Sequence, residues 1–260
     1  MRIDVISLFP QLVEQVGRYG VVGRAVDNAK VALRSWNPRD YATDRHRTTD
    51  DRAYGGGPGM VMKVEPLSAA LEAAHAAGAT GPVVCMTPQG QPFSQAFAER
   101  LAAEPGMVLV CGRYEGFDER FLAAHVDAEL SLGDYVLSGG ELPAMVVIDA
   151  CVRLLPGVLG HEASASEDSF ASGALDHPHY TRPERLPQGN IPAVLLSGDH
   201  ARIRRWRLKQ ALGRTWLRRP DLLEGLALSA QAQELLREYI QEQAEDASQA
   251  AGEPIAKSES

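Results

Sequence analysis

The pattern that most constrains this chain is a series of short apolar runs that alternate with segments of helical periodicity. Residues 82–86 and 107–111 are apolar almost throughout, as strands buried on both faces of a sheet are. Between them, residues 93–101 repeat apolar side chains at helical spacing. Before them, residues 66–77 form a helical segment with Pro near its start and Gly after its end. This alternation predicts an α/β domain with a mostly parallel sheet that helices cover on both faces.

Three of the predicted strands end in loops that contain Gly or Pro, at residues 87–90, 112–116 and 132–140. In open α/β sheets, ligands bind beyond the carboxyl ends of the strands. Glycine also lets the backbone approach a ligand closely, because it has no Cβ atom. The three loops together therefore predict a ligand site at one edge of the sheet.

The charged residues of these loops narrow the class of ligand. Glu115, Asp134 and Glu141 are acidic, whereas a phosphate site would need cationic side chains, so a neutral or cationic ligand is favoured over a nucleoside triphosphate. The glycine-rich residues 54–60 are not followed by the Gly-Lys-Ser/Thr of a P-loop. His177-Pro178-His179 is interpreted as a surface connector and not as a zinc site, and no metal site is predicted.

A basic helix is expected near the C-terminal end of an otherwise acidic chain. The net charge is −8, yet residues 200–219 contain eight Lys or Arg and no Asp or Glu. Such a concentration predicts a local contact with a polyanion. Ser197 or Asp199 is expected to cap this helix, and Gly213 is expected to end it.

Four regions are predicted along the chain. Residues 1–160 form the α/β domain, 161–190 a flexible linker or lid, 191–244 a small all-helical domain and 245–260 a disordered tail. The three cysteines are widely spaced and lack a CxxC pair, which indicates reduced thiols and a cytoplasmic protein. No apolar run reaches the length that spans a membrane.

Several motifs, in this order, resemble the TrmD family of bacterial tRNA (guanine-N1)-methyltransferases, of the SPOUT superfamily. The resemblance extends from Ile3 to about Tyr239. It is carried by Tyr54-Gly-Gly-Gly-Pro-Gly-Met60, Cys111-Gly-Arg-Tyr-Glu-Gly116, Gly133-Asp-Tyr-Val-Leu-Ser-Gly-Gly-Glu-Leu-Pro143, Glu167-Asp-Ser-Phe170, His179-Tyr-Thr-Arg-Pro183 and Arg204-Arg-Trp-Arg-Leu-Lys-Gln210.

The resemblance implies a SPOUT-type fold whose α/β domain ends in a trefoil knot that binds S-adenosylmethionine. It also implies a homodimer with active sites shared between subunits, and methyl transfer to N1 of guanosine 37 of tRNA. Magnesium is possible by resemblance alone.

Site residues carried over by position fall into three groups. The cofactor-binding residues would be Met86, Pro88, Gly112, Tyr114, Glu115, Leu132, Gly133, Asp134, Tyr135, Val136, Leu137, Gly139 and Gly140. The RNA-binding residues would be Arg204, Arg205, Arg207 and Lys209. The catalytic residues would be Asp168, as general base, and Arg153, which would stabilise charge on the guanine.

The chemistry agrees with these catalytic roles. N1 of guanine carries a proton at neutral pH, and a carboxylate such as Asp168 can remove it. The negative charge that then develops on O6 suits a guanidinium such as that of Arg153. Two alternatives stay open: a SPOUT methyltransferase that acts on another RNA position, such as a ribose 2′-hydroxyl, and a non-catalytic RNA-binding protein.

Overall fold

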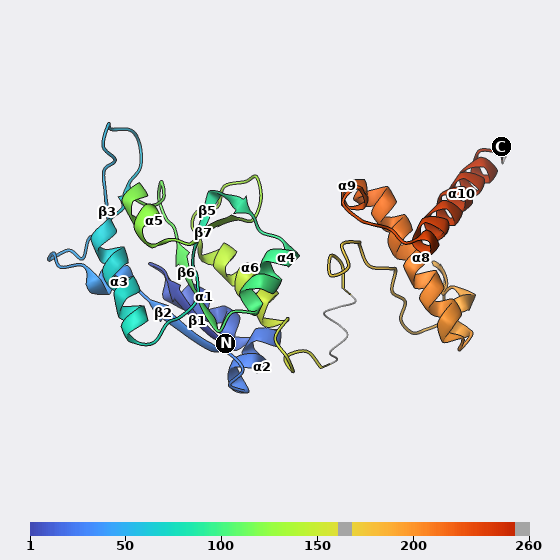
Figure 1. The fold of residues 1–260 in the computed structure, drawn as a ribbon, viewed down its shortest axis with the longest axis horizontal. Helices are drawn as coiled ribbons and strands as arrows, with labels where there is room; N and C mark the ends of the chain where they lie inside the picture. The colour runs from blue at the N-terminus through green and yellow to red at the C-terminus, as the bar shows by residue number, and fades with distance from the viewer. Residues whose placement is uncertain (161–167, 253–260) are drawn as a thin grey trace, which may run out of the picture. The chain divides into compact units, whose positions relative to one another are not determined.

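The computed structural model describes residues 1–160 and 168–252, and the chain divides into two compact units at residues 165 and 166 (Figure 1). Each unit is described by itself. The first contains a parallel sheet with helices on both faces, as predicted. Helices predominate in the second. In the described ranges, no helix is both long and apolar enough to cross a membrane.

A five-stranded parallel sheet forms the centre of the first unit, with the strand order β2-β1-β6-β5-β7. The pairings of β1 with β2, β1 with β6 and β5 with β6 are regular, as when Ile3 pairs with Met107 and Val84 pairs with Leu109, whereas the pairing of β5 with β7 has an irregularity between Met86 and Gln91. The strands are β1 (Arg2–Ile6), β2 (Ala32–Trp36), β5 (Val83–Pro92), β6 (Gly106–Cys111) and β7 (Ala128–Ser131).

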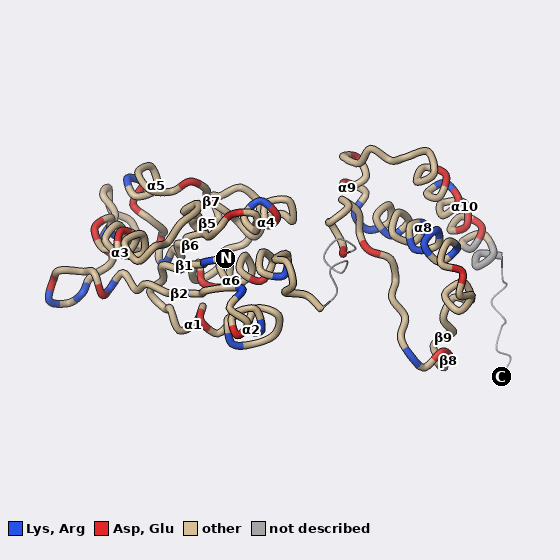
Figure 2. The backbone as a smooth tube through the Cα atoms, turned by 60° about the horizontal axis from the view of Figure 1, so that its bottom comes forward, with Lys and Arg blue, Asp and Glu red and all other residues tan. Residues whose placement is uncertain are grey.

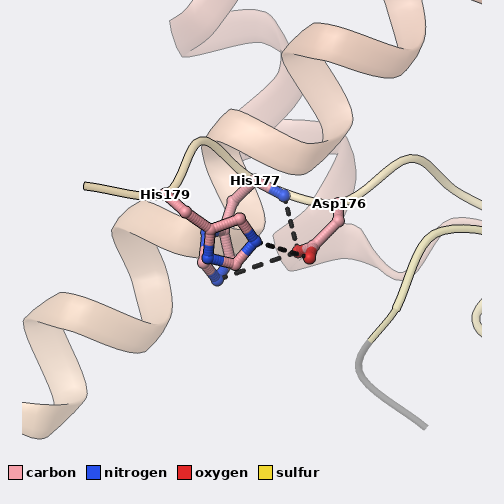
Figure 3. A group of neighbouring side chains, drawn as sticks. All are labelled: Asp176, His177 and His179. Carbon is pink, nitrogen blue, oxygen red and sulfur yellow. Dashed lines mark hydrogen bonds and ion pairs between the residues drawn. The ribbon is translucent and has the colours of Figure 1, made fainter. Parts of the chain in front are cut away.

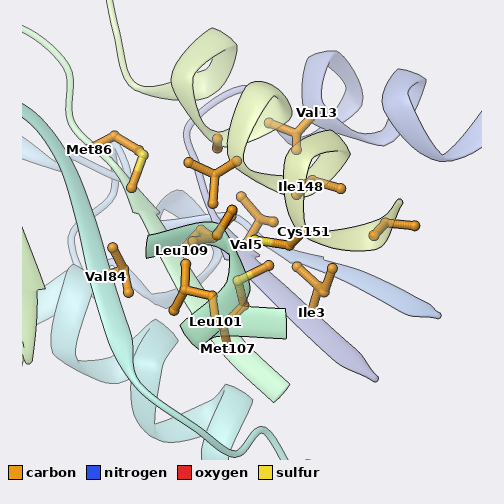
Figure 4. Close-up of a cluster of buried hydrophobic side chains, with 14 of the residues drawn as sticks. Ile3, Val5, Val13, Val84, Met86, Leu101, Met107, Leu109, Ile148 and Cys151 are labelled. Atoms are coloured by element: carbon orange, nitrogen blue, oxygen red, sulfur yellow. The ribbon is translucent and has the colours of Figure 1, made fainter. Parts of the chain in front are cut away.

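Side chains alternate between the two faces of this sheet, so each face has a hydrophobic core of its own. Leu109 faces the core shown in Figure 4, and its neighbour Val110 faces the other core. The first core is covered by α1 (Pro10–Glu14), α2 (Gly20–Asp27), α4 (Gln95–Ala102) and α6 (Glu141–Val152). The second core is covered by α3 (Val64–Ala76) and α5 (Glu119–His125).

Smaller elements complete the described part of the chain. The 3-10 helices are η1 (Gln15–Arg18), η2 (Pro38–Tyr41) and η3 (Ala193–Leu196). Two short antiparallel pairs are formed by β3 (Asp50–Asp51) with β4 (Val61–Met62) and by β8 (Arg185–Leu186) with β9 (Gly189–Asn190).

In the described part of the second unit, the α-helices are α8 (His200–Arg218), α9 (Pro220–Glu224) and α10 (Ala230–Gly252). Asp199 caps α8, because its carboxylate accepts hydrogen bonds from the backbone N–H groups of Ala201 and Arg202. The prediction that Gly213 ends this helix is wrong. Gly213 lies inside α8, where a Cβ atom would be 2.4 Å from the ring of Tyr239 on α10. Gly213 thus provides close packing between helices.

Two other expectations need correction. The disordered tail was expected from residue 245, but α10 continues to Gly252, because the Ala-, Glu- and Gln-rich sequence there favours a helix. Residues 253–260 lie outside the described ranges. The flexible linker was expected over 161–190, of which 161–167 also lie outside them. Residues 176–180, by contrast, pack on α8, with the rings of His177 and Tyr180 beside Trp206.

Candidate functional site

The middle of β5 and the loops that follow β6 and β7 surround a cavity of about 250 Å³. Residues 87–90 bulge out of the ladder between β5 and β7, since Met86 and Gln91 both pair with Leu130. The sequence predicted a loop at residues 87–90, but they belong to β5 as an irregular stretch. They meet the loops at 112–116 and 132–140 at one cavity, and this convergence was predicted. The cavity is lined by Met86, Thr87, Pro88, Gln89, Gly112, Arg113, Tyr114, Glu115, Gly116, Phe117, Leu130, Ser131, Leu132, Gly133, Tyr135, Val136, Leu137, Ser138, Gly139, Gly140 and Pro143.

The backbone of these loops is packed closely enough to require glycine. The N–H of Gly140 donates a hydrogen bond to the carbonyl of Gly112 at 2.8 Å. A Cβ atom on Gly140 would lie 2.8 Å from the Cα atom of Cys111 and 2.9 Å from the Cβ atom of Met86. Tyr114 adopts a φ of 59°, which is uncommon for a residue other than glycine and marks a constrained loop.

A buried ion pair supports the loop from behind. The carboxylate of Glu141 is almost fully buried; it accepts a hydrogen bond from Ser7 Oγ at 2.7 Å and lies 2.9 Å from Arg113 Nη2. Arg113 Nη1 donates to the carbonyl of Ser138 at 3.0 Å, and its guanidinium lies over the ring of Phe9. Glu141 thus connects β1 to the loop that closes the cavity.

Sequence reasoning did not assign Arg113 a role, although it lies within a motif that carried the resemblance. Two signals could have identified it: a charged residue directly after a buried strand, and the acidic Glu141 at the start of an apolar helix. The thiol of Cys111, the last residue of β6, is not suited to act as a nucleophile. Burial, and then the negative charge of Glu141, raise its pKa well above the usual range.

The second unit has a smaller cavity of about 210 Å³ beside α8. Asp168 and Asp176 line it together with Arg204 and Arg207, so it combines both signs of charge. Burial tends to raise the pKa of Asp176. Hydrogen bonds from His179 and from the backbone of His177, with the charges of both imidazoles, outweigh burial and lower the pKa.

Several Lys and Arg residues lie along α8 (Figure 2), and their side chains differ in their surroundings. Arg205 Nη2 forms an ion pair with Glu238, and Lys209 Nζ forms one with Glu242 at 2.6 Å. Both partners are on α10. These two cations connect helices, whereas Arg204 and Arg207 reach the cavity that Asp168 lines.

The predicted site residues are therefore distributed over both units. Of the predicted cofactor-binding residues, all but Asp134 line the larger cavity. Arg153, the C-cap residue of α6, does not line it. Asp168 belongs to the second unit and lines the smaller cavity there. The roles assigned to these residues stay predictions.

Comparison with known proteins identifies a family and several similar enzymes. The family model described as tRNA (Guanine-1)-methyltransferase TrmD matches residues 1–225. The tRNA (guanine-N(1)-)-methyltransferase of Halorhodospira halophila is 62% identical over 242 residues, which cover 93% of this chain and 92% of that protein. The enzyme of the same name from Methylococcus capsulatus is 60% identical over 243 residues, or 93% and 97% of the two chains. That of Klebsiella pneumoniae strain 342 is 59% identical over 246 residues, or 94% and 96%.

Proposed function

The chain belongs to the tRNA (guanine-1)-methyltransferase family, TrmD, and we infer that it methylates N1 of a guanine in tRNA with S-adenosylmethionine as methyl donor. We further propose that the guanine is that of guanosine 37, that Asp168 is the general base and that Arg153 stabilises the developing charge. The observation that carries the proposal is the cavity at the carboxyl edge of the sheet, in a chain whose α8 is strongly basic.

The lining of the larger cavity suits S-adenosylmethionine. Met86, Leu130 and Leu137 provide apolar surface for an adenine ring, and Gly139 and Gly140 leave room at the cavity wall for the ribose and the amino acid portion, because they have no side chain. Glu115 supplies a carboxylate at the cavity wall, which favours a positively charged sulfonium. When bound there, S-adenosylmethionine supplies an electrophilic methyl group.

The chain's own groups then have to handle one proton and one developing charge. The bond from N1 of guanine to the methyl carbon would form as the bond from that carbon to sulfur breaks, which leaves S-adenosylhomocysteine, and the N1 proton passes to the carboxylate of Asp168. The guanidinium of Arg153 is proposed to lie beside O6 of the guanine, where negative charge grows as the proton leaves. Arg204 and Arg207, which share a cavity with Asp168, are placed to contact the phosphates of the same RNA.

The substitution Asp168→Asn tests the role of the base. It should leave S-adenosylmethionine binding, measured by equilibrium dialysis, unchanged. It should lower single-turnover methyl transfer to an unmodified tRNA transcript about 10²- to 10⁴-fold, the usual contribution of a general base.

The matched control is Asp199→Asn, because asparagine also caps helices well and α8 is retained. A transcript with uridine in place of guanosine 37 should accept no methyl group. Near-normal turnover by Asp168→Asn would remove Asp168 from the role of base.

We propose that the working enzyme is a homodimer in which each site combines the cavity of one subunit with the partner's Asp168. The helices α1 and α6 pack beside each other, and both expose large apolar side chains, including Leu12, Leu142 and Val146. Val136, on the cavity rim, is 85% exposed. A second copy would cover this apolar surface together with the rim.

Complementation tests the shared site. Leu137→Arg places a cation in the cavity, which should repel the sulfonium, and Asp168→Asn removes the base, so each homodimer should be inactive. Heterodimers formed from the two variants should regain methyl transfer, because one of their two sites has an intact cavity and Asp168. Val146→Glu should yield monomers by light scattering. Mixed variants that stay inactive, although they exchange subunits, would refute sharing.

The trefoil knot and the magnesium ion are likewise inferences from the family. We propose that the loop at 132–140 takes part in the knot; its contacts with the end of β6, where Gly139 bridges Arg113, support this. Magnesium prefers oxygen ligands. In the described ranges, the group of side chains close enough to hold a metal ion is Asp176, His177 and His179. Two of its three ligands are nitrogens, so it does not fit magnesium.

A further inference from the structure

Three side chains from a short extended segment converge on one point beside α8 (Figure 3). His179 Nε2 lies 2.8 Å from Asp176 Oδ2, and His177 Nε2 lies 3.8 Å from Asp176 Oδ1. The ligand atoms of the three residues all lie within 4.8 Å of one another. The sequence interpretation of His177 and His179 as a surface connector does not account for this arrangement.

The hydrogen bonds around the group orient it as outer-shell contacts orient metal ligands. His177 Nδ1 lies 3.1 Å from the carbonyl of Pro178. A carbonyl can only accept, so Nδ1 carries the hydrogen, which leaves Nε2, the nitrogen that faces Asp176, as the atom that would bind a metal ion. Histidines that bind a metal ion commonly donate a hydrogen bond from the N–H of their other ring nitrogen in this way.

The carboxylate of the group is held in place as well. The backbone N–H of His177 donates to Asp176 Oδ1 at 2.6 Å, and the backbone N–H of Asp176 donates to Ser169 Oγ at 2.9 Å. Ring contacts between His177 and Trp206 attach the segment to α8. The group is therefore formed on a fixed backbone, close to the turn that carries Asp168.

We propose that Asp176, His177 and His179 bind a divalent transition-metal ion, with Zn²⁺ as the best match. Metal–ligand distances of about 2.0–2.2 Å for zinc place ligand atoms roughly 3–3.5 Å apart, which small movements of the present side chains achieve. Two imidazoles and one carboxylate suit zinc, whereas magnesium and calcium prefer oxygen ligands. Three protein ligands leave at least one coordination position open to water or to an oxygen atom of a bound molecule.

A metal ion at this position would cross-link residues 176–179. Asp176 and His177 also line the smaller cavity, with Asp168 and Arg204. The ion would thus stiffen one wall of the cavity in which we place the base. The binding inference does not depend on the methyl transfer reaction, because it rests on ligand geometry within the second unit.

Zn²⁺ binding to the chelator-treated full chain tests the proposal. Equilibrium dialysis should give one Zn²⁺ per chain, and Co²⁺ in its place should give visible absorption bands typical of low coordination number. His177→Gln and His179→Gln should each weaken Zn²⁺ binding at least about tenfold, as changes close to a metal usually do. His200→Gln, which removes an exposed histidine from the start of α8, is the matched control and should bind normally.

Two results would overturn the inference. The first is that the unaltered chain binds less than one Zn²⁺ per chain, or binds Zn²⁺ no more tightly than Asp176→Ala does. A hydrogen bond without a metal ion would then account for the contact between His179 and Asp176. The second is displacement of Zn²⁺ by equimolar Mg²⁺. The side chain of His179 is 70% exposed, so His179→Gln should fold, and a circular dichroism spectrum checks that it does.

Discussion

The substitution Glu141→Gln should both destabilise the first unit and weaken binding at its cavity. It removes the negative charge from a buried pair whose other member, Arg113, keeps its positive charge. Arg113 retains its hydrogen bond to the carbonyl of Ser138 and its contact with Phe9. The remaining guanidinium is nevertheless mostly buried, with 19% of its side chain exposed.

The expected loss follows from the cost of a buried charge left without its partner. Breaking such a pair usually costs about 3–5 kcal/mol. The partial exposure and remaining contacts of Arg113 place this case at the lower end, at about 3 kcal/mol. For a domain of this size, a loss of about 3 kcal/mol lowers the melting temperature by roughly 6–12 °C.

Urea unfolding followed by circular dichroism measures the stability, and equilibrium dialysis below the melting temperature measures S-adenosylmethionine affinity. The control Glu72→Gln, on the exposed surface of α3, should change the stability by less than about 0.5 kcal/mol. Adding Arg113→Met to Glu141→Gln removes both charges and should recover more than half of the loss. A loss below about 1 kcal/mol in the single variant would refute the reasoning.

Three further outcomes are expected. Gly213→Ala should destabilise the second unit despite the higher helix propensity of alanine, since its Cβ atom would meet the ring of Tyr239. Thermal unfolding of Gly213→Ala, with and without Tyr239→Leu, checks this prediction. A Gly213→Ala variant that is more stable than the unaltered chain would contradict it. Arg204→Ala should weaken tRNA binding and reduce the salt dependence of the binding constant by about one counterion. Arg205→Ala removes an ion pair with α10 and should leave this salt dependence nearly unchanged. Filter-binding titrations at several salt concentrations compare the two variants, and equal salt dependence would contradict the prediction. Asp118 caps α5, and hydrogen bonds from Arg120 lower its pKa to about 2. This folded-state pKa lies below the usual value of about 3.9. The ionised carboxylate of Asp118 therefore stabilises the folded state above about pH 4, and this contribution is lost as the pH falls toward 2. Asp118→Asn should reduce the dependence of the free energy of unfolding in urea on pH between about 4 and 2. An unchanged pH dependence would show that Asp118 does not contribute to it.

The order of elements in the first unit could be predicted from local patterns, because a strand buried on both faces is apolar throughout. Residues 107–111 illustrate this: they are expected as a buried strand and form β6 (Gly106–Cys111). The short helix α2 (Gly20–Asp27) was missed, since two of its eight residues, Gly20 and Gly23, are glycines, which disfavour helices. The strand order β2-β1-β6-β5-β7 depends on contacts between distant segments, which local periodicity does not contain.

The site divides in the same way. The sequence determined by itself that glycine-containing loops follow β6 and β7, because residue type sets which backbone conformations are accessible. Residues 87–90 were expected as a third loop, but pairing with β7 keeps them in β5. Tertiary structure alone brought Glu141 to Arg113 and Ser7, which are 28 and 134 residues away along the chain. Tertiary structure also gives the cations of α8 different surroundings: Arg205 forms an ion pair with Glu238, whereas Arg204 lines the cavity with Asp168. Charge and composition are properties of residues, whereas the partner of each charge is decided by packing.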